Sequence, residues 1–260
     1  ICISAIVITM ILYSSNLILN IFISILSLAL LFEWMKVSES STVKRSIFLI
    51  LFIILISSDH YFGGLFEPIS LITMLGIIVW IVVAYQIFLK QGRLSSNFTF
   101  NNFWIGLLII SAFCLVCFQL LTGSRVFLLA VILNIAVFDT GAYIIGKNFG
   151  RNPYLPELSP NKTVEGLIGG LISSLLFVIC AYLLLEEVSL LQSSVMILAI
   201  PFALCGDYFF SFLKRKANVK DTGSILPGHG GLLDRVDSHL AAIPMTLFFL
   251  LLLNTAGSYF

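Results

Sequence analysis

The stretch S-F-L-K-R-K-A-N-V-K-D-T-G-S-I-L-P-G-H-G-G-L-L-D-R-V-D, from Ser211 to Asp237, concentrates charge in a chain of which only 10% of residues are charged. It contains five basic residues, three carboxylates and His229. Long apolar segments flank it, at about 189–212 and 239–253. Charged groups between two such segments lie at a membrane surface or in a cavity that opens from it, where charge usually marks function. The stretch therefore predicts a polar site at the edge of a membrane-embedded fold.

The composition of the chain is that of a membrane protein. Of its 260 residues, 59% are hydrophobic, and the mean hydropathy of +1.08 lies far outside the range of water-soluble globular domains. These values predict an all-α, polytopic integral membrane protein. The net charge of +1 leaves no large basic field, so nucleic acid is not an expected partner. The five cysteines lie inside apolar runs and are interpreted as small apolar fillers.

Nine apolar segments are candidates for membrane helices, which need roughly 20 apolar residues each. The polar residues that suggest chemistry begin at Asp139. Residues 1–120 are therefore interpreted as N-terminal scaffold helices, and residues 121–260 as the catalytic part. The nine segments lie at about 1–12, 17–33, 46–58, 69–89, 103–120, 125–146, 166–185, 189–212 and 239–253.

The basic residues predict how these segments are oriented. With nine spans and the N-terminus inside, the connections after the second, fourth, sixth and eighth spans lie on the inner side. Of the fourteen lysines and arginines, only Arg125 falls outside these connections. Such a split over short loops follows the positive-inside rule. It predicts that Ser211–Asp237 faces the cytoplasm from the inner membrane.

A first polar group is D-T-G-A-Y-I-I-G-K, from Asp139 to Lys147, inside an apolar segment. A carboxylate at Asp139 is costly there unless it faces a cavity or a cation. An alternative is that Asp139 pairs with a nearby basic residue and only supports helix packing. The two glycines of this group, Gly141 and Gly146, favour a close approach between helices.

A second polar group is L-S-P-N-K-T-V-E-G, from Leu158 to Gly166, in which a turn at Ser159 leads into a helix. Lys162 and Thr163 lie near the start of that helix, where free backbone N–H groups favour an anion such as phosphate. An ordinary charged helix start, with Glu165 in the first turn, explains the pattern equally well.

The third group is the Ser211–Asp237 stretch together with Asp207 in the apolar segment before it. Asp234 and Asp237 are three residues apart and share a face if a helix begins near them. Carboxylate oxygens suit Mg²⁺, which takes one or two carboxylates plus substrate phosphates and water. A metal ion and a nucleoside triphosphate are therefore the predicted ligands. The basic residues that could neutralise phosphate oxygens are Lys214, Arg215, Lys220 and Arg235.

Each part of the third group also has a simpler explanation when taken alone. Residues 214–216 could anchor a helix by the positive-inside rule, and His229 could be an ordinary loop histidine. The combination of acids, bases and glycines between two membrane segments favours a functional site. Within it, Gly230 and Gly231 allow the backbone to approach a ligand closely.

These residues resemble the phosphatidate cytidylyltransferase family, also called CDP-diacylglycerol synthases. The family pattern S-x-x-K-R-x-x-x-x-K-D-x-G-x-x-x-P-x-H-G-G-x-x-D-R-x-D is filled without a gap from Ser211 to Asp237. The segments at 139–147 and 159–166 are also similar to that family. One position departs from it, because bacterial members often carry Glu where this chain has Phe210.

The resemblance implies transfer of a cytidylyl group from CTP to phosphatidic acid by an enzyme that forms a homodimer in the membrane. We expect Asp207 and Asp234 to hold Mg²⁺, with a second cation such as K⁺ nearby and with Asp139, Asp221 and Asp237 as further candidate ligands. The catalytic candidates are Asp207, Lys220, Asp221, Asp234 and Asp237. The substrate-binding candidates are Ser159, Lys162, Thr163, Ser211, Lys214, Arg215, His229, Gly230, Gly231 and Arg235.

Two other functions remain open at this point. A CTP-dependent kinase acting on a polyprenol or another lipid would need a similar set of residues. A membrane transporter would use charged residues along a path through the bilayer. The clustering of charge on the predicted cytoplasmic side argues against the transporter.

Overall fold

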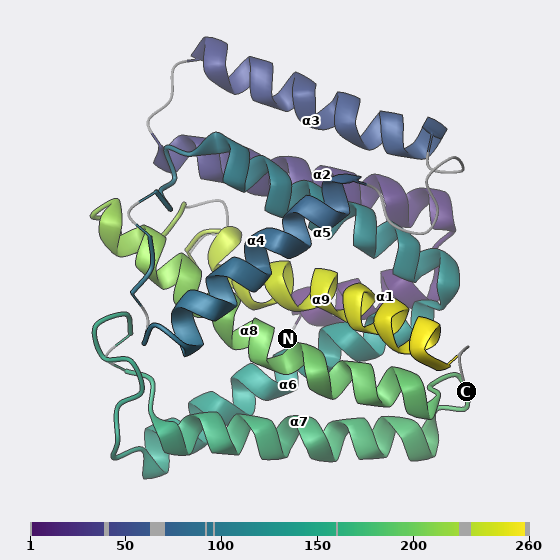
Figure 1. Cartoon of the computed structure of the whole chain (residues 1–260). Helices are drawn as coiled ribbons and strands as arrows, with labels where there is room; N and C mark the ends of the chain where they lie inside the picture. The colour runs from purple at the N-terminus through teal and green to yellow at the C-terminus, as the bar shows by residue number, and fades with distance from the viewer. Residues whose placement is uncertain are drawn as a thin grey trace.

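The computed structural model describes residues 2–38, 42–62, 71–91, 93–95, 97–159, 161–223 and 230–257. These residues form nine α-helices and no β-strand, which confirms the predicted all-α class (Figure 1). The helices are α1 (Cys2–Tyr13), α2 (Asn16–Val37), α3 (Thr42–Phe62), α4 (Leu71–Phe88), α5 (Phe103–Gly123), α6 (Arg125–Phe149), α7 (Val164–Leu184), α8 (Leu190–Lys216) and α9 (Leu233–Gly257).

Seven of the helices within the described residues are long and apolar enough to cross a membrane, namely α2 and α4 to α9. The sequence predicts nine such segments, so the structure supports a smaller number. Helix α1 has 12 residues, roughly 18 Å of helix, whereas a bilayer core is about 30 Å thick. Helix α3 carries Lys44 and Arg45 near its start and Asp59 near its end, which shortens its apolar part.

The ends of the helices alternate between two sides of the bundle. Figure 1 shows that α2, α4, α6 and α8 end at the left side, where α3, α5, α7 and α9 begin. The last turns of α2, α6 and α8 carry basic residues, whereas Arg125 opens α6 at the opposite side. The structure therefore brings the basic residues of separate connections to one side of the fold.

Helix α9 begins earlier than the predicted segment at 239–253. It starts at Leu233, so Asp234 and Asp237 both belong to its first turns. Helix α8 likewise extends to Lys216, beyond the predicted end at 212, and includes Lys214. These two extensions carry charged side chains of the third polar group on regular helices, and they fix the spacing between them.

Glycines allow α6 and α7 to pack closely. A Cβ atom at Gly166 of α7 would lie 2.8 Å from the Ala142 carbonyl oxygen and 3.0 Å from Gly146 Cα of α6. At Gly170, an added Cβ would lie 2.8 Å from the Phe138 carbonyl oxygen. Real side chains do not fit at such distances, and the contact of Gly166 with Gly146 confirms the close approach predicted for Gly146.

We expect Gly170→Ala to lower the thermal unfolding temperature of the detergent-solubilised protein. Helix propensity alone predicts a gain of about 1 kcal/mol for this change. The collision with Phe138 opposes it, and overpacking typically costs about 1–3 kcal/mol. Gly123→Ala is the matched control, because a Cβ at Gly123 meets nothing within 4 Å. Equal or higher stability of Gly170→Ala would contradict this packing.

Candidate active site

A cavity of about 760 Å³ opens where α6, α7, α8 and α9 meet the connection between α6 and α7. Its lining combines carboxylates, basic side chains and the Tyr154 and Tyr208 rings. The structure thus brings together residues from all three polar groups of the sequence. The predicted site residues that line the cavity are Asp139, Ser159, Lys162, Thr163, Asp207, Lys214, Asp234, Arg235 and Asp237.

Three carboxylates from three different helices converge on this cavity. Asp139 of α6, Asp207 of α8 and Asp237 of α9 interact with one another electrostatically. Helix α8 can approach α9 here because Gly206 has no side chain. A Cβ atom at this position would collide with the Asp237 carbonyl oxygen. Within this group, Asp207 forms an ion pair with Lys162. The cavity therefore gathers three carboxyl groups and the Lys162 ammonium group at one point.

The connection between α6 and α7 holds Lys162 in place. Pro153 and Thr163 form an isolated β-bridge, and the Tyr154 N–H donates to the Lys162 carbonyl at 2.8 Å. The Lys162 ammonium lies 4.3 Å from the centre of the Tyr208 ring. The Tyr208 hydroxyl in turn donates to the Tyr154 carbonyl at 2.8 Å. Lys162 is thus fixed by its backbone, an aromatic face and Asp207.

Local hydrogen bonds explain two other residues of the second polar group. The Thr163 hydroxyl caps α7 by accepting from the Gly166 N–H at 3.1 Å. The Glu165 carboxylate accepts from the backbone N–H groups of Arg151 and Asn152 at 3.0 and 3.2 Å. Glu165 therefore closes the connection, as the simpler explanation of this group suggests, while Lys162 and Thr163 line the cavity.

Tyr154 contributes a neutral wall to the cavity. Burial raises the pKa of the Tyr154 phenol above its ordinary value, with a smaller contribution from Cys205. The phenol is therefore protonated at neutral pH, because an unperturbed tyrosine already titrates near 10.

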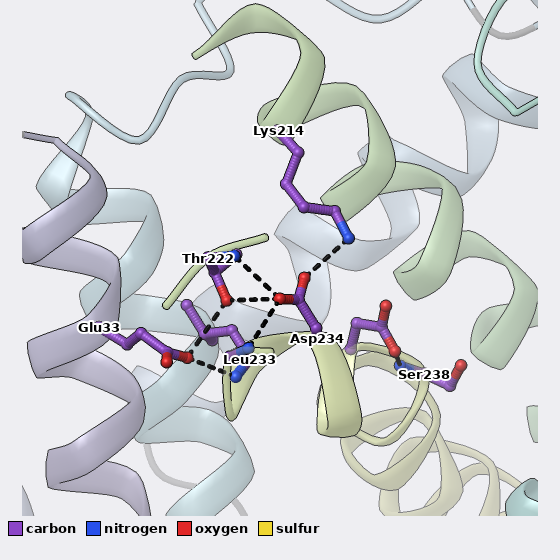
Figure 2. Close-up of polar contacts among 8 residues, drawn as sticks. Glu33, Lys214, Thr222, Leu233, Asp234 and Ser238 are labelled. Atoms are coloured by element: carbon purple, nitrogen blue, oxygen red, sulfur yellow. Dashed lines mark hydrogen bonds and ion pairs between the residues drawn. The ribbon is translucent and has the colours of Figure 1, made fainter. Parts of the chain in front are cut away.

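Asp234, at the start of α9, has both oxygens engaged (Figure 2). Its Oδ1 accepts from Lys214 Nζ at 2.7 Å, within an ion pair that is mostly buried. Its Oδ2 accepts from the Thr222 N–H at 2.8 Å, the Thr222 hydroxyl at 3.1 Å and the Gly231 N–H at 3.2 Å. The chain after Asp221 thus fixes Oδ2, while Oδ1 faces Lys214.

Several predicted site residues do not line the cavity. The Arg215 side chain donates to the Glu157 carbonyl at 2.6 Å, which holds the α6–α7 connection against α8. Lys220 and Asp221 are exposed. Gly230 has a positive φ of 80°, as expected for a glycine turn, and Gly231 donates to Asp234. Ser211 lies on α8 outside the cavity lining. His229 lies outside the described residues.

Sequence reasoning missed Glu33 and Thr222. Glu33, on α2, is fully buried and accepts hydrogen bonds from Thr222 and Leu233. A single carboxylate at the end of an apolar segment was the available signal, because such a residue needs a partner. The sequence does not reveal that this partner lies some two hundred residues away.

The cavity residues fit a divalent cation. Within the described ranges, no group of three or more His, Cys, Asp or Glu side chains is arranged to hold a metal by itself. Mg²⁺ does not require one, since it usually binds one or two carboxylates together with substrate phosphates and water. The convergence of the Asp139, Asp207 and Asp237 carboxyl groups beside Lys162 favours such an ion, because a cation would offset the repulsion between ionised carboxylates.

The fold and the cavity define a helical membrane protein with an acidic site flanked by basic side chains. A model of the Cytidylyltransferase family matches residues 1–253. The chain therefore belongs to this family.

Individual relatives agree with this assignment. The phosphatidate cytidylyltransferase of Staphylococcus aureus (strain COL) is 32% identical over 258 residues, which cover 94% of each chain. The protein of the same name from Bacillus subtilis (strain 168) is 44% identical over 120 residues, covering 45% of this chain and 44% of that protein. The one from Staphylococcus haemolyticus is 44% identical over 122 residues, or 46% of each chain.

We expect the Lys214–Asp234 pair to show a coupling energy in a double-mutant cycle of thermal stability. Lys214→Met and Asp234→Asn should each destabilise the protein, because each leaves a mostly buried partner unpaired. The double variant should lose less than the sum, with a coupling of about 0.5–3 kcal/mol. A cycle of Asp234→Asn with Lys90→Met, which changes an exposed lysine two residues after the end of α4, should be additive. Additivity in both cycles would contradict the pair.

Proposed function

We propose that this protein transfers the cytidylyl group of CTP to phosphatidic acid, which yields CDP-diacylglycerol and pyrophosphate for phospholipid synthesis. The observation that carries the proposal is the cavity in which Asp207 and Asp234 lie beside Lys162, Lys214 and Arg235 at one end of a membrane bundle. Membership of the Cytidylyltransferase family and the names of the relatives support it.

The chemistry joins two anions, which explains the need for basic residues. A phosphate oxygen of phosphatidic acid attacks the α-phosphorus of CTP and forms a new P–O bond. The bond between this phosphorus and the bridging oxygen breaks, and pyrophosphate leaves with the electron pair. Most catalysis in such reactions comes from positioning and charge stabilisation. Lys162, Lys214 and Arg235 line the cavity and can offset the repulsion between the substrates.

Asp207 and Asp234 are the proposed Mg²⁺ ligands, and Asp139 is a third candidate close to Asp207. When bound, the cation would neutralise charge on the phosphates, and a second cation such as K⁺ would add to this effect. Hydrogen bonds from Thr222 and Gly231 to Oδ2 fix the Asp234 carboxylate, so Oδ1, which faces Lys214, is the oxygen that would bind the cation. Lys162 and Lys214 keep the two carboxylates paired and lie beside the space for the phosphates.

The arrangement in the membrane extends the proposal. Helices α2 and α4 both end on the left side of the bundle in Figure 1. Helix α3 begins on that side and ends on the opposite side, so it crosses the bundle. We therefore assign a membrane span to α3 as well, which gives eight; the ninth predicted segment, α1, has 12 residues and covers only part of the bilayer core. The side of the bundle that carries the basic helix ends is assigned to the cytoplasmic face of the inner membrane. The active form is proposed to be a homodimer.

Labelled CTP distinguishes the proposed reaction from its alternatives. We expect purified protein, incubated with phosphatidic acid, Mg²⁺ and CTP, to move label from the α-phosphate of CTP into the lipid. Transfer of the γ-phosphate label would instead identify a lipid kinase. Solute uptake into proteoliposomes without any CTP turnover would identify a transporter. Either of these two results would overturn the proposal.

We further expect Mg²⁺ to raise the thermal unfolding temperature of the protein in detergent. Binding to the folded state contributes about 2.7 kcal/mol at a concentration of 100 Kd. Asp207→Asn should abolish this shift because it removes a proposed ligand. Glu186→Gln is the matched control, since Glu186 is exposed between α7 and α8 at the other side of the bundle. A full Mg²⁺ shift in Asp207→Asn would disprove this metal assignment.

A further inference from the structure

Glu33 connects α2 with the start of α9. It lies near the end of α2 and is 0% exposed, as is its neighbour Trp34. Figure 2 shows its side chain directed from α2 toward Thr222 and Leu233. A buried carboxylate is costly unless hydrogen bonds compensate for the loss of water. Glu33 is therefore expected to make hydrogen bonds that compensate for its burial.

The first contact is with the N-terminus of α9. Glu33 Oε2 accepts from the Leu233 N–H at 2.7 Å, and Leu233 is the first residue of that helix. The first N–H groups of a helix have no partner inside the helix, and a negative charge beside them is favourable. Glu33 thus caps α9 from a helix that is distant in the sequence. This contact therefore joins α2 to the first residue of α9.

The second contact leads into the cavity. Glu33 Oε2 also lies 3.2 Å from the Thr222 hydroxyl, which is itself 3.1 Å from Asp234 Oδ2. The hydroxyl has one proton, which it shares between the two carboxylates or donates to one of them at a time. Since Asp234 Oδ1 pairs with Lys214, a continuous series of polar contacts runs from Glu33 on α2 to Lys214, which lines the cavity. Figure 2 shows this series from Glu33 to Lys214.

The backbone around Thr222 is shaped to admit Glu33. A Cβ atom at Gly223 would collide with the Glu33 carboxylate, with the Cδ atom only 2.7 Å away. The absence of a side chain at Gly223 therefore lets the chain after Thr222 pack directly on Glu33. Glu33 itself is not among the residues that line the cavity. Its influence on the reaction must act through Thr222 and α9.

We propose that Glu33 is a positioning residue that fixes the start of α9 and the orientation of Asp234 toward the cavity. This inference rests on the proposed function for its kinetic consequences. A misplacement of about 1 Å at a reacting centre can cost about a hundredfold in rate. We expect the loss of Glu33 to lower kcat of protein that remains folded, which distinguishes it from a residue that contributes only to stability.

The test compares steady-state kinetics of purified variants, each corrected for its folded fraction. Glu33→Ala removes the acceptor for Leu233 and Thr222, and kcat should fall about ten- to a hundredfold. Glu33→Gln keeps one acceptor oxygen and should recover part of this loss. Trp34→Phe is the matched control, because it removes a buried hydrogen bond from the same helix, to the Phe100 carbonyl at 2.9 Å. It should lower stability but leave kcat within about twofold of wild type.

Thr222→Val keeps the proposal testable if Glu33→Ala does not fold. It removes the hydroxyl between the two carboxylates and should lower kcat as Glu33→Gln does. Glu33→Gln and Thr222→Val interrupt the same series of contacts. The Glu33→Gln/Thr222→Val double variant should therefore have a kcat no lower than that of the slower single variant. Full kcat in Glu33→Ala or Thr222→Val, or multiplied losses in the double variant, would overturn the inference.

A readout that does not use activity separates this inference from the proposed function. Absence of CDP-diacylglycerol formation by wild-type protein would refute the function alone. In that case the Lys214–Asp234 coupling energy is measured by thermal unfolding in the Glu33→Gln background. We expect it to fall to less than half of its value with Glu33 present, because Thr222 and the start of α9, through which Glu33 acts on Asp234, are then fixed less firmly. An unchanged coupling energy would refute the positioning role.

Discussion

Charged groups in membrane helices must face one another or a cavity, and this constraint organises the fold. Asp139, Asp207 and Asp237 come from three helices that are otherwise strongly apolar. Exposure of these carboxylates to lipid is costly, so α6, α8 and α9 must turn them toward a common space. Lys162 completes the arrangement from the α6–α7 connection. The cavity is therefore a consequence of helix packing as well as a place for chemistry.

Close packing makes this convergence possible. Gly166 and Gly170 let α7 approach α6, and Gly206 lets α8 approach α9. The second requirement is a defined start for α9, because Asp234, Arg235 and Asp237 all lie within its first turns. Glu33 and Thr222 supply this by holding Leu233 and Asp234. The N-terminal helices thus take part in shaping the site.

The sequence predicted the features that depend on local pattern. Apolar segments predict the all-α class, and charge within such segments identifies Asp139 and Asp207. Lys162 is predicted from its place at a helix start, and Asp234 from its three-residue spacing to Asp237. Contacts between distant segments could not be predicted from the sequence. Glu33 resembles any carboxylate at a helix end until Thr222 and Leu233 are seen beside it. The arginine at 215 looked like a phosphate ligand, but it donates to the Glu157 carbonyl, a contact that requires the folded connection.

The proposed reaction requires that CTP bind in the cavity where the carboxylates converge. An experimental structure of the protein with CTP and Mn²⁺ in place of Mg²⁺ tests this most directly, because anomalous scattering locates the metal. The account predicts the metal beside Asp207 and Asp234, with the triphosphate among Lys162, Lys214 and Arg235. A nucleotide and metal bound away from this cavity, with the carboxylates still paired to their lysines, would contradict it.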